Sequence, residues 1–286
     1  MEIIASIREL RNSLNNQGHI AFVPTMGNLH DGHLKLVDIA KQHAQCVVVS
    51  IFVNPLQFGP HEDLANYPRT LEADCRKLQA AGANIVFTPS VKEMYPDAVS
   101  AGEGLNLRQT MKVTSPPIAN ELCGASRPGH FDGVATVVAK LFNIVQPDIA
   151  VFGKKDFQQL FIIRELVKQF NLPIEIIAGD TVREPSGLAM SSRNGYLTET
   201  QKNQAAQLYK MLESIVLRVR NGTAELGILA DAASLALKEL GWDVDYVSFR
   251  NQTTLMPATS EDKQLIVLAA AKLGTTRLID NIDFLR

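Results

Sequence analysis

Two histidines three residues apart are the first feature of this sequence that indicates chemistry. His30 and His33 lie in the stretch VPTMGNLHDGHLKL, after an apolar run and at the start of an expected helix. Residues three apart share one face of a helix, and the amides at a helix N-terminus attract anions. Gly27 and Gly32 would let the backbone come close to a ligand. This setting predicts a phosphate site.

Two other interpretations of the histidine pair stay open. The pair is structural if the two rings only pack against their surroundings. A zinc site is the second alternative, but the familiar zinc-binding pair on a helix is four residues apart and has a neighbouring glutamate. No cysteine or acidic cluster lies nearby in the sequence to complete such a site.

The stretch GKKDFQQL places Lys154, Lys155 and Asp156 at an expected strand-to-helix turn. One of these lysines would reach a phosphate as a point charge, and Asp156 is placed to cap the following helix. Gln158 and Gln159 are uncharged donors and acceptors that suit a hydroxyl or a carboxylate. Taken alone, the lysine pair is equally typical of a solvated surface.

The segment MSSRN, Met190 to Asn194, offers two hydroxyls and a guanidinium in a polar connection. Such groups bind phosphates well, although a serine-capped turn also has this composition.

Asn54 and Gln57 begin a long loop over residues 52–70, and long loops are often functional. Arg127 lies in the glycine-rich stretch GASRPGHFDG with His130; singly, each of these four residues is also typical of a turn or a surface.

The hydrophobic pattern alternates between strands and helices. A helix is expected over residues 2–16. Strands are then expected at 19–24, 46–53, 84–89, 148–153 and 174–179, separated by helices at about 31–43, 68–82, 133–145 and 156–170. This order predicts an α/β fold with a doubly wound, Rossmann-like parallel sheet and right-handed crossovers. Because ligands bind beyond the carboxyl ends of such strands, the polar stretches are expected to converge on one cleft.

The pattern changes after about residue 176, where a polar, glycine-containing connection begins. Helices are expected near 198–219 and 223–240, and strands at 242–250 and 264–273. We therefore predict one domain over residues 1–176 and a smaller α+β C-terminal domain over residues 177–286.

Bulk properties are those of an ordinary soluble protein. A net charge of -2 over 286 residues provides no basic field for nucleic acid. Three scattered cysteines indicate reduced thiols, and neither a secretory signal nor a membrane-spanning run is apparent, so a cytoplasmic protein is expected. The sequence contains no P-loop, no GxGxxG loop and no GxSxG elbow.

His30-Asp31-Gly32-His33 resembles the HIGH signature of the adenylate-forming nucleotidyltransferases, and Met190-Ser191-Ser192-Arg193 resembles their KMSKS signature. Six longer strings resemble one family within that superfamily over essentially the whole chain: PTMGNLHDGH, VSIFVNPLQF, YPRT, RPGHF, GKKDFQQL and GLAMSSRN. This family is pantothenate synthetase, also called pantoate–β-alanine ligase.

The resemblance implies an ATP-dependent condensation of (R)-pantoate with β-alanine through a pantoyl adenylate, with AMP and pyrophosphate as by-products. It implies catalytic roles for His33, the proposed acid, and for His30, Lys155 and Arg193. The implied ATP-binding residues are Met26, Gly27, Asn28, Leu29, His30, Asp31, Gly32, His33, Gly153, Lys154, Lys155, Asp156, Val182, Met190, Ser191, Ser192 and Arg193. Gln57 would bind pantoate and β-alanine and Gln159 pantoate, with Asn54 and Arg127 as further substrate-binding residues.

The same resemblance implies Mg²⁺, a homodimer, small-molecule substrates, no nucleic acid and no membrane partner. The first domain would bind nucleotide and pantoate, and the second would act as a lid. Two residues depart from the family: Lys154 stands where many relatives have glutamate, and Cys123 where relatives often have an acidic residue.

Four alternatives remain at this point: another adenylyltransferase of the superfamily, a small aminoacyl-tRNA synthetase, a non-catalytic ATP-binding regulator, and a zinc hydrolase. The synthetase is disfavoured because the chain lacks a basic RNA-binding face.

Overall fold

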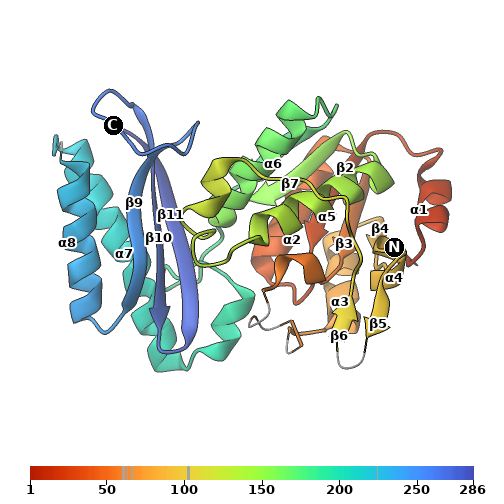
Figure 1. The fold of residues 1–286 in the computed structure, drawn as a ribbon, viewed down its shortest axis with the longest axis horizontal. Helices are drawn as coiled ribbons and strands as arrows, with labels where there is room; N and C mark the ends of the chain where they lie inside the picture. Colours follow the sequence, from red (N-terminus) through yellow and green to blue (C-terminus); the bar gives the residue numbers. More distant parts are fainter. Residues whose placement is uncertain (60–61, 63, 66, 102–103, 224) are drawn as a thin grey trace. The chain divides into compact units, whose positions relative to one another are not determined.

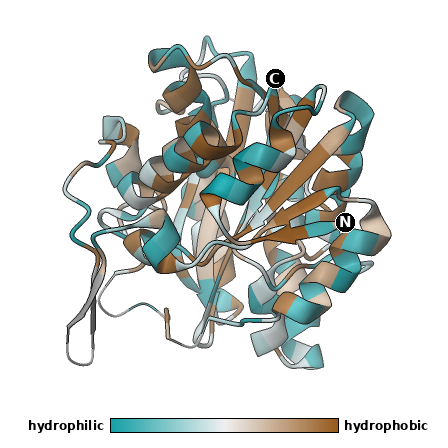
Figure 2. Cartoon of the chain, turned by 90° about the vertical axis from the view of Figure 1, so that its right-hand side faces the viewer, coloured by the Kyte–Doolittle hydropathy of each residue, from teal (hydrophilic) through white to brown (hydrophobic). Residues whose placement is uncertain are grey.

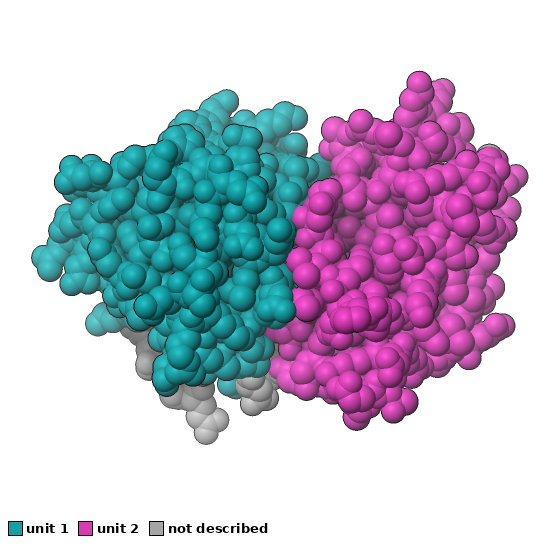
Figure 3. Space-filling model, turned by 180° about the vertical axis from the view of Figure 1, so that it is seen from behind, with its two compact units in different colours: residues 1–153, 159–179 teal, residues 154–158, 180–286 magenta. Residues whose placement is uncertain are grey.

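The computed structural model describes residues 1–59, 62, 64–65, 67–101, 104–223 and 225–286. The chain forms two compact units (Figure 3). Unit 1 comprises residues 1–153 and 159–179, and unit 2 comprises residues 154–158 and 180–286. The short segment 154–158 therefore groups with the C-terminal part of the chain, although it lies between two elements of unit 1.

Unit 1 contains a six-stranded parallel sheet in the order β1-β4-β3-β2-β7-β8 (Figure 1). The strands are β1 (Glu2–Ile4), β2 (Ile20–Thr25), β3 (Cys46–Ile51), β4 (Ile85–Phe87), β7 (Ile149–Gly153) and β8 (Glu175–Gly179). The main helices are α1 (Ile7–Leu14), α2 (Asp31–His43), α3 (Leu71–Ala81), α5 (His130–Val145) and α6 (Phe157–Gln169). The predicted doubly wound parallel sheet is confirmed. Its strand order reverses between β2 and β7, which is where ligands bind in such sheets.

The central strands are buried on both faces, as their sequences predict. Strand β3 reads CVVVSI, and its first five residues are buried. Val47 and Val49 pack with Val37 of α2 and Leu78 of α3 in one apolar cluster. Strands covered by helices on both sides are expected to be continuous apolar runs, and Figure 2 shows them in the hydrophobic colour.

The smaller elements of unit 1 connect the main ones. They are the helix α4 (Val91–Met94), the antiparallel hairpin β5 (Val99–Ala101) and β6 (Gly104–Asn106), and the 3₁₀ helices η1 (Pro55–Gln57) and η2 (Pro117–Asn120). Helix η1 opens the expected long loop, of which residues 60, 61, 63 and 66 lie outside the described residues.

The prediction of a single helix over residues 2–16 is wrong. Residues 2–4 pair with β4 as an edge strand, and Ser6 then caps α1 by accepting from the Glu9 amide.

Unit 2 contains a three-stranded antiparallel sheet in the order β11-β10-β9. Its elements are the 3₁₀ helices η3 (Lys154–Asp156) and η4 (Ser192–Tyr196), the helices α7 (Glu199–Arg220) and α8 (Leu226–Glu239), and the strands β9 (Asp243–Asn251), β10 (Gln264–Leu273) and β11 (Thr276–Leu285). Residue 224, at the expected start of the second helix, lies outside the described residues. The smaller α+β region is confirmed. Strand β11 was not expected from the sequence.

The border between the units follows the end of a strand. The expected division after residue 176 would cut β8, which continues to Gly179, and the two units divide after that residue. Whether each unit folds as an independent domain stays a prediction. Across the described part of the chain, no helix is long and apolar enough to span a membrane.

Candidate active site

The segment between β2 and α2 is a tight turn with two left-handed residues, Gly27 at φ 87° and Asn28 at φ 52°. The amides of Asn28 and Leu29 each donate to the Asp74 carboxylate at 2.8 Å. A Cβ on Gly27 would lie 3.2 Å from that carboxylate and 3.1 Å from Ile51, which is tighter than ordinary contact, and a side chain at this φ would be strained, so the turn favours glycine. The MGN stretch is therefore shaped by a carboxylate on α3.

Helix α3 holds this turn at further points. Asp74 is only 1% exposed, and it also accepts from the Thr70 hydroxyl at 3.0 Å. Lys77, one turn further along α3, donates to the Leu29 carbonyl at 2.6 Å. No local sequence pattern links these three residues to the turn, because they lie more than 40 positions from it.

His30 and His33 form a cap at the start of α2. The His30 Nδ1 accepts from the Gly32 amide at 3.2 Å, and the His33 Nδ1 accepts from the His30 amide at 3.3 Å. The ring centroids are 4.1 Å apart. A ring nitrogen that accepts is unprotonated, so in each neutral ring this network assigns the proton to Nε2, as a donor.

This cap weighs against the zinc alternative. A histidine that binds zinc through one ring nitrogen normally donates from the other, whereas here both Nδ1 atoms accept backbone N–H groups. The cap also occupies the Gly32 amide, which was expected to face a phosphate. Within the described residues, no group of three His, Cys, Asp or Glu side chains is arranged to hold a metal ion.

A second cluster of expected site residues surrounds η1. Gln57 donates to the Met26 sulfur at 3.1 Å and accepts from the Asn54 amide at 3.2 Å. Asn54 also donates to the Gly133 carbonyl at 3.1 Å and accepts from the Tyr95 hydroxyl at 2.6 Å. Burial raises the pKa of Tyr95, so its hydroxyl remains a donor at neutral pH. The structure thus joins Met26, Asn54 and Gln57, and adds Tyr95 beneath them.

Arg127 and His130 both contact the backbone carbonyl of Gln57. The His130 Nδ1 is 2.8 Å from the Gln57 carbonyl, and its Nε2 is 3.0 Å from Arg127. Arg127 forms a two-pronged ion pair with Glu62. Burial alone would raise the pKa of Glu62, but the hydrogen bonds and charge of Arg127 outweigh it and lower that pKa. In this state a carboxylate of the chain itself occupies the guanidinium expected to bind substrate.

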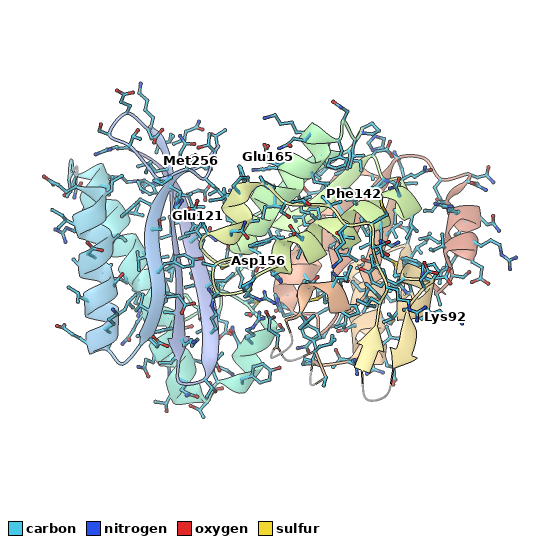
Figure 4. All side chains as sticks on the ribbon, in the orientation of Figure 1. Lys92, Glu121, Phe142, Asp156, Glu165 and Met256 are labelled. Atoms are coloured by element: carbon cyan, nitrogen blue, oxygen red, sulfur yellow. The ribbon has the colours of Figure 1, made fainter. Side chains whose placement is uncertain are left out.

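In unit 2, Lys154 and Lys155 occupy different environments. Lys154 Nζ lies 2.8 Å from Asp180 and 3.3 Å from Asp283. The hydrogen bond to Asp180, aided by Asp283, raises the pKa of Lys154 despite partial burial. Lys155 Nζ is 3.6 Å from Asp156, a half-exposed side chain labelled in Figure 4. The side chain of Lys154 is therefore held by carboxylates of its own unit.

The connection that carries MSSRN is a short strap, residues 182–194. The Met190 amide donates to the Val182 carbonyl at 2.9 Å, which brings two expected ATP-binding residues together. Ser191 caps η4 by accepting from the Arg193 amide at 3.2 Å. Asn194 is buried and donates to Glu184 at 2.8 Å.

The remaining expected residues have defined places. Gly153 ends β7, and a Cβ there would meet no atom within 4 Å. Gln159 lies in the first turn of α6. Cys46 and Cys75 are buried, and burial raises the pKa of each thiol, which makes both unsuited to nucleophilic chemistry. That the residues of the two units converge on one cleft stays a prediction.

The parallel sheet, with a glycine turn and a histidine-capped helix at its switch point, defines the class: α/β proteins that bind ligands at the carboxyl ends of parallel strands. A family model described as pantoate-beta-alanine ligase matches residues 1–283. The chain belongs to this family.

Sequence relatives and solved structures agree with this assignment. A pantothenate synthetase from Methylobacillus flagellatus is 64% identical over 284 residues, which is 99% of each chain. The crystal structure of pantothenate synthetase from Thermus thermophilus has a TM-score of 0.90 at 41% identity and covers 99% of both chains. The pantoate-beta-alanine ligase from Francisella tularensis, complexed with beta-gamma ATP and beta-alanine, has a TM-score of 0.78 at 35% identity and covers 100% of this chain and 97% of that one.

Proposed function

We propose that this protein condenses pantoate with β-alanine at the expense of ATP, as the name of its family describes. The observation that carries the proposal is the histidine cap on α2, in which both Nδ1 atoms accept backbone N–H groups. Each neutral ring then carries its proton on Nε2, and an Nε2–H group is a donor that suits a phosphate oxygen. The zinc-hydrolase alternative would need the opposite tautomer.

The chemistry requires an activated acid. A carboxylate does not condense with an amine in water, because its oxygen is a poor leaving group. In the first step the pantoate carboxylate attacks the α-phosphate of ATP, pyrophosphate leaves, and a pantoyl adenylate forms. In the second step the neutral amine of β-alanine attacks the acyl carbon, AMP leaves and the nitrogen loses a proton. No nucleophilic serine or cysteine is needed.

The first step brings one anion against another, and donors and cations must offset that repulsion. The Nε2–H groups of His30 and His33 would stabilise charge on the phosphates, with His33 as the acid. Lys155 and Arg193 would add positive charge. The remaining ATP-binding residues are proposed as expected from the sequence, in the turn 26–33, at 153–156, at Val182 and at 190–193.

Pantoate is proposed to bind at Gln57 and Gln159, with Gln57 also next to β-alanine. The contacts of Gln57 support this assignment, because Asn54 and Met26 contact its side chain and His130 contacts its backbone carbonyl. Arg127 would bind a substrate carboxylate once Glu62 releases it. Two substrates bound in the correct orientation react faster, because their translational and rotational entropy has already been lost on binding.

Mg²⁺ is proposed to reach the site with ATP. This ion commonly uses one or two carboxylates together with substrate phosphates, so a chain without a preformed three-ligand cluster among its described residues suits it. Asp156, half exposed beside Lys155, is the carboxylate placed to help hold it. When bound, the ion would neutralise phosphate charge.

We further propose that unit 2 closes as a lid and shields the adenylate from water, that the protein is a homodimer, and that it works in the cytoplasm. The grouping of residues 154–158 with unit 2 supports the lid, because both the lysine turn and the strap would then move together. Light scattering of the purified protein tests the dimer.

The decisive test is pantoate-dependent exchange of labelled pyrophosphate into ATP, with Mg²⁺ and without β-alanine. We expect exchange, which would show that pantoate is adenylated before any amine is present. Folded protein that binds ATP but shows no exchange would contradict the proposal. Exchange with a phosphate ester in place of pantoate would instead identify another adenylyltransferase of the superfamily.

A further inference from the structure

Two adjacent residues of β11, Asp280 and Asn281, hold two segments that the proposed function places against the nucleotide. Both are nearly buried, at 4% and 6% exposure. β11 is an edge strand of its sheet, so its outer backbone groups have no strand partner there. Side chains of adjacent strand residues point to opposite faces, so a pair like this is able to contact two different segments.

Asn281 holds the lysine turn. Its side-chain amide donates to the Lys154 carbonyl at 3.0 Å and to the Lys155 carbonyl at 2.8 Å. These carbonyls follow strand β7, and one amide nitrogen satisfies both. Asp283, two residues further along β11, adds its contact with the Lys154 ammonium.

Asp280 holds the strap. Its carboxylate accepts hydrogen bonds from Nη1 and Nη2 of Arg183, at 2.7 and 2.9 Å, and from the backbone amide of Asn281 at 2.8 Å. Arg183 in turn donates to the Gly187 carbonyl at 3.1 Å and lies 3.4 Å from the centroid of the Tyr209 ring. The base of the strap is therefore tied to β11 by a charge-assisted pair between the buried Asp280 and the partly buried Arg183.

We propose that Asn281 is a positioning residue for Lys155. By bonding the carbonyls of residues 154 and 155, it holds the lysine turn at a set distance from the strap that Asp280 anchors. Lys155 and the segment Ser191–Arg193 then meet the nucleotide as one group. This inference rests on the proposed function, but it concerns contacts inside unit 2 alone.

The test replaces Asn281 by aspartate, which keeps the size but removes the donor and sets a carboxylate against two carbonyls. We expect the kcat/KM for ATP in pyrophosphate exchange to fall by about 10- to 100-fold, because small displacements of a catalytic group cost this much. The KM for pantoate is expected to stay within twofold. Asn281→Ala serves as the second variant, in case the added charge unfolds the protein.

Thr276→Ala is the matched control, since Thr276 is also nearly buried (7%) on β11 but lies at the hairpin end of the strand. It should change kcat/KM by less than twofold. Equal effects of the Asn281 and Thr276 variants on ATP kinetics would overturn the proposal. Loss of the folded state in both Asn281 variants, measured by circular dichroism, would assign the residue to stability alone and also overturn it.

A double-mutant cycle separates positioning from stability. In a Lys155→Ala background, Asn281→Asp should lower the affinity for a non-hydrolysable ATP analogue by less than about twofold, because the group it positions is gone. If the affinity loss of the double variant equals the product of the losses in Lys155→Ala and Asn281→Asp, the proposal is contradicted. If the unaltered chain shows no pantoate-dependent exchange, the proposed function fails. The role of Asn281 is then still tested by the affinity for the ATP analogue and by amide hydrogen exchange over residues 154–158. If both are the same in Asn281→Asp as in the unaltered chain, Asn281 does not position the lysine turn.

Discussion

The histidine turn of unit 1 and the lysine turn of unit 2 are both anchored by a buried side chain, but with opposite hydrogen-bonding polarity. Asp74 accepts from the amides of Asn28 and Leu29, whereas Asn281 donates to the carbonyls of Lys154 and Lys155. The difference follows from the backbone groups that each turn leaves over. The first turn directs two amides at α3, and the second, which follows β7, directs two carbonyls at β11.

This comparison shows why the anchors differ in type although the turns serve one proposed reaction. Buried backbone groups need hydrogen-bond partners. A carboxylate can accept from two backbone N–H groups, and the NH₂ of a carboxamide can donate to two backbone carbonyls. The anchors also differ in sequence distance: 45 and 46 positions for Asp74, but 126 and 127 for Asn281. The histidine turn is therefore anchored from a nearer part of the sequence, while the lysine turn depends on β11, the last of the described strands.

The largest expected effect comes from removing one chemical group in each region. His33→Ala and Lys155→Ala should each lower pantoate-dependent pyrophosphate exchange by about 10²- to 10⁴-fold, because each loses a donor or charge directed at the phosphates. Circular dichroism should show an unchanged fold. His43→Ala, an exposed histidine at the other end of α2, is the control and should exchange normally. Near-normal exchange in either site variant would refute its assigned role.

The anchor of the histidine turn is tested by Asp74→Asn. The amide oxygen still accepts, but the NH₂ group now faces a backbone N–H or the Thr70 hydroxyl, so a buried donor loses its partner. We expect a loss of about 1–3 kcal/mol in the free energy of unfolding, measured by urea denaturation, together with slower exchange.

Glu72→Gln on the same helix provides the comparison for Asp74. Its carboxylate is exposed and pairs with Arg76, also exposed, so the change should cost less than about 1 kcal/mol. If Asp74→Asn behaved like Glu72→Gln in both stability and exchange, the turn would not depend on α3.

A smaller effect on stability is expected from changing Tyr95, which contacts Asn54 next to Gln57. Tyr95→Phe removes the hydroxyl that donates to Asn54 and leaves a buried acceptor with one partner fewer. The free energy of unfolding should fall by about 1 kcal/mol. The KM for pantoate should rise several-fold, while the KM for ATP should not change. A rise confined to the KM for ATP would show that this cluster serves the nucleotide.

The smallest effect concerns Lys154, the lysine held by Asp180 and Asp283. Its pKa in the folded state is raised above the ordinary 10.5, so its stabilisation is complete below about pH 10.5 and is lost as the pH rises through the folded pKa. Lys154→Gln should therefore lower the melting temperature at pH 8, by the equivalent of at most about 1 kcal/mol for a partly exposed pair. The difference in melting temperature between Lys154→Gln and the unaltered chain should disappear at pH values above the folded-state pKa of Lys154. A gap that persists at high pH would mean that packing, and not charge, is what the lysine contributes.

Sequence patterns predicted most of the fold because apolar periodicity is a local property. The alternation of strands and helices in unit 1, the two helices of unit 2 and strands β9 and β10 all follow from it. Four strands were missed: β1, β5, β6 and β11. The first three are each only three residues long, and the apolar pattern of β11 is broken by the buried polar pair Asp280 and Asn281.

The candidate site was predictable where its residues form a motif. His30, His33, Lys155 and the MSSRN segment were singled out by their spacing and by their resemblance to a family, which the family model and the relatives confirm. Their roles stay predictions. The supporting residues Asp74, Tyr95 and Asn281 carry no motif, because a buried side chain that bonds distant backbone leaves no periodic signal in its own neighbourhood.

The sequence by itself determined which chemistry is available to this protein: the residue types, their order and the strand ends that carry them. Only the tertiary structure decided how those residues are held. The tautomer of the histidine pair, the pairing of Arg127 with Glu62 and the attachment of the lysine turn to β11 all depend on backbone and side-chain groups brought together from distant positions. Hydrogen bonds act over about 3 Å in space and are indifferent to distance along the chain, so they appear only once the chain has folded.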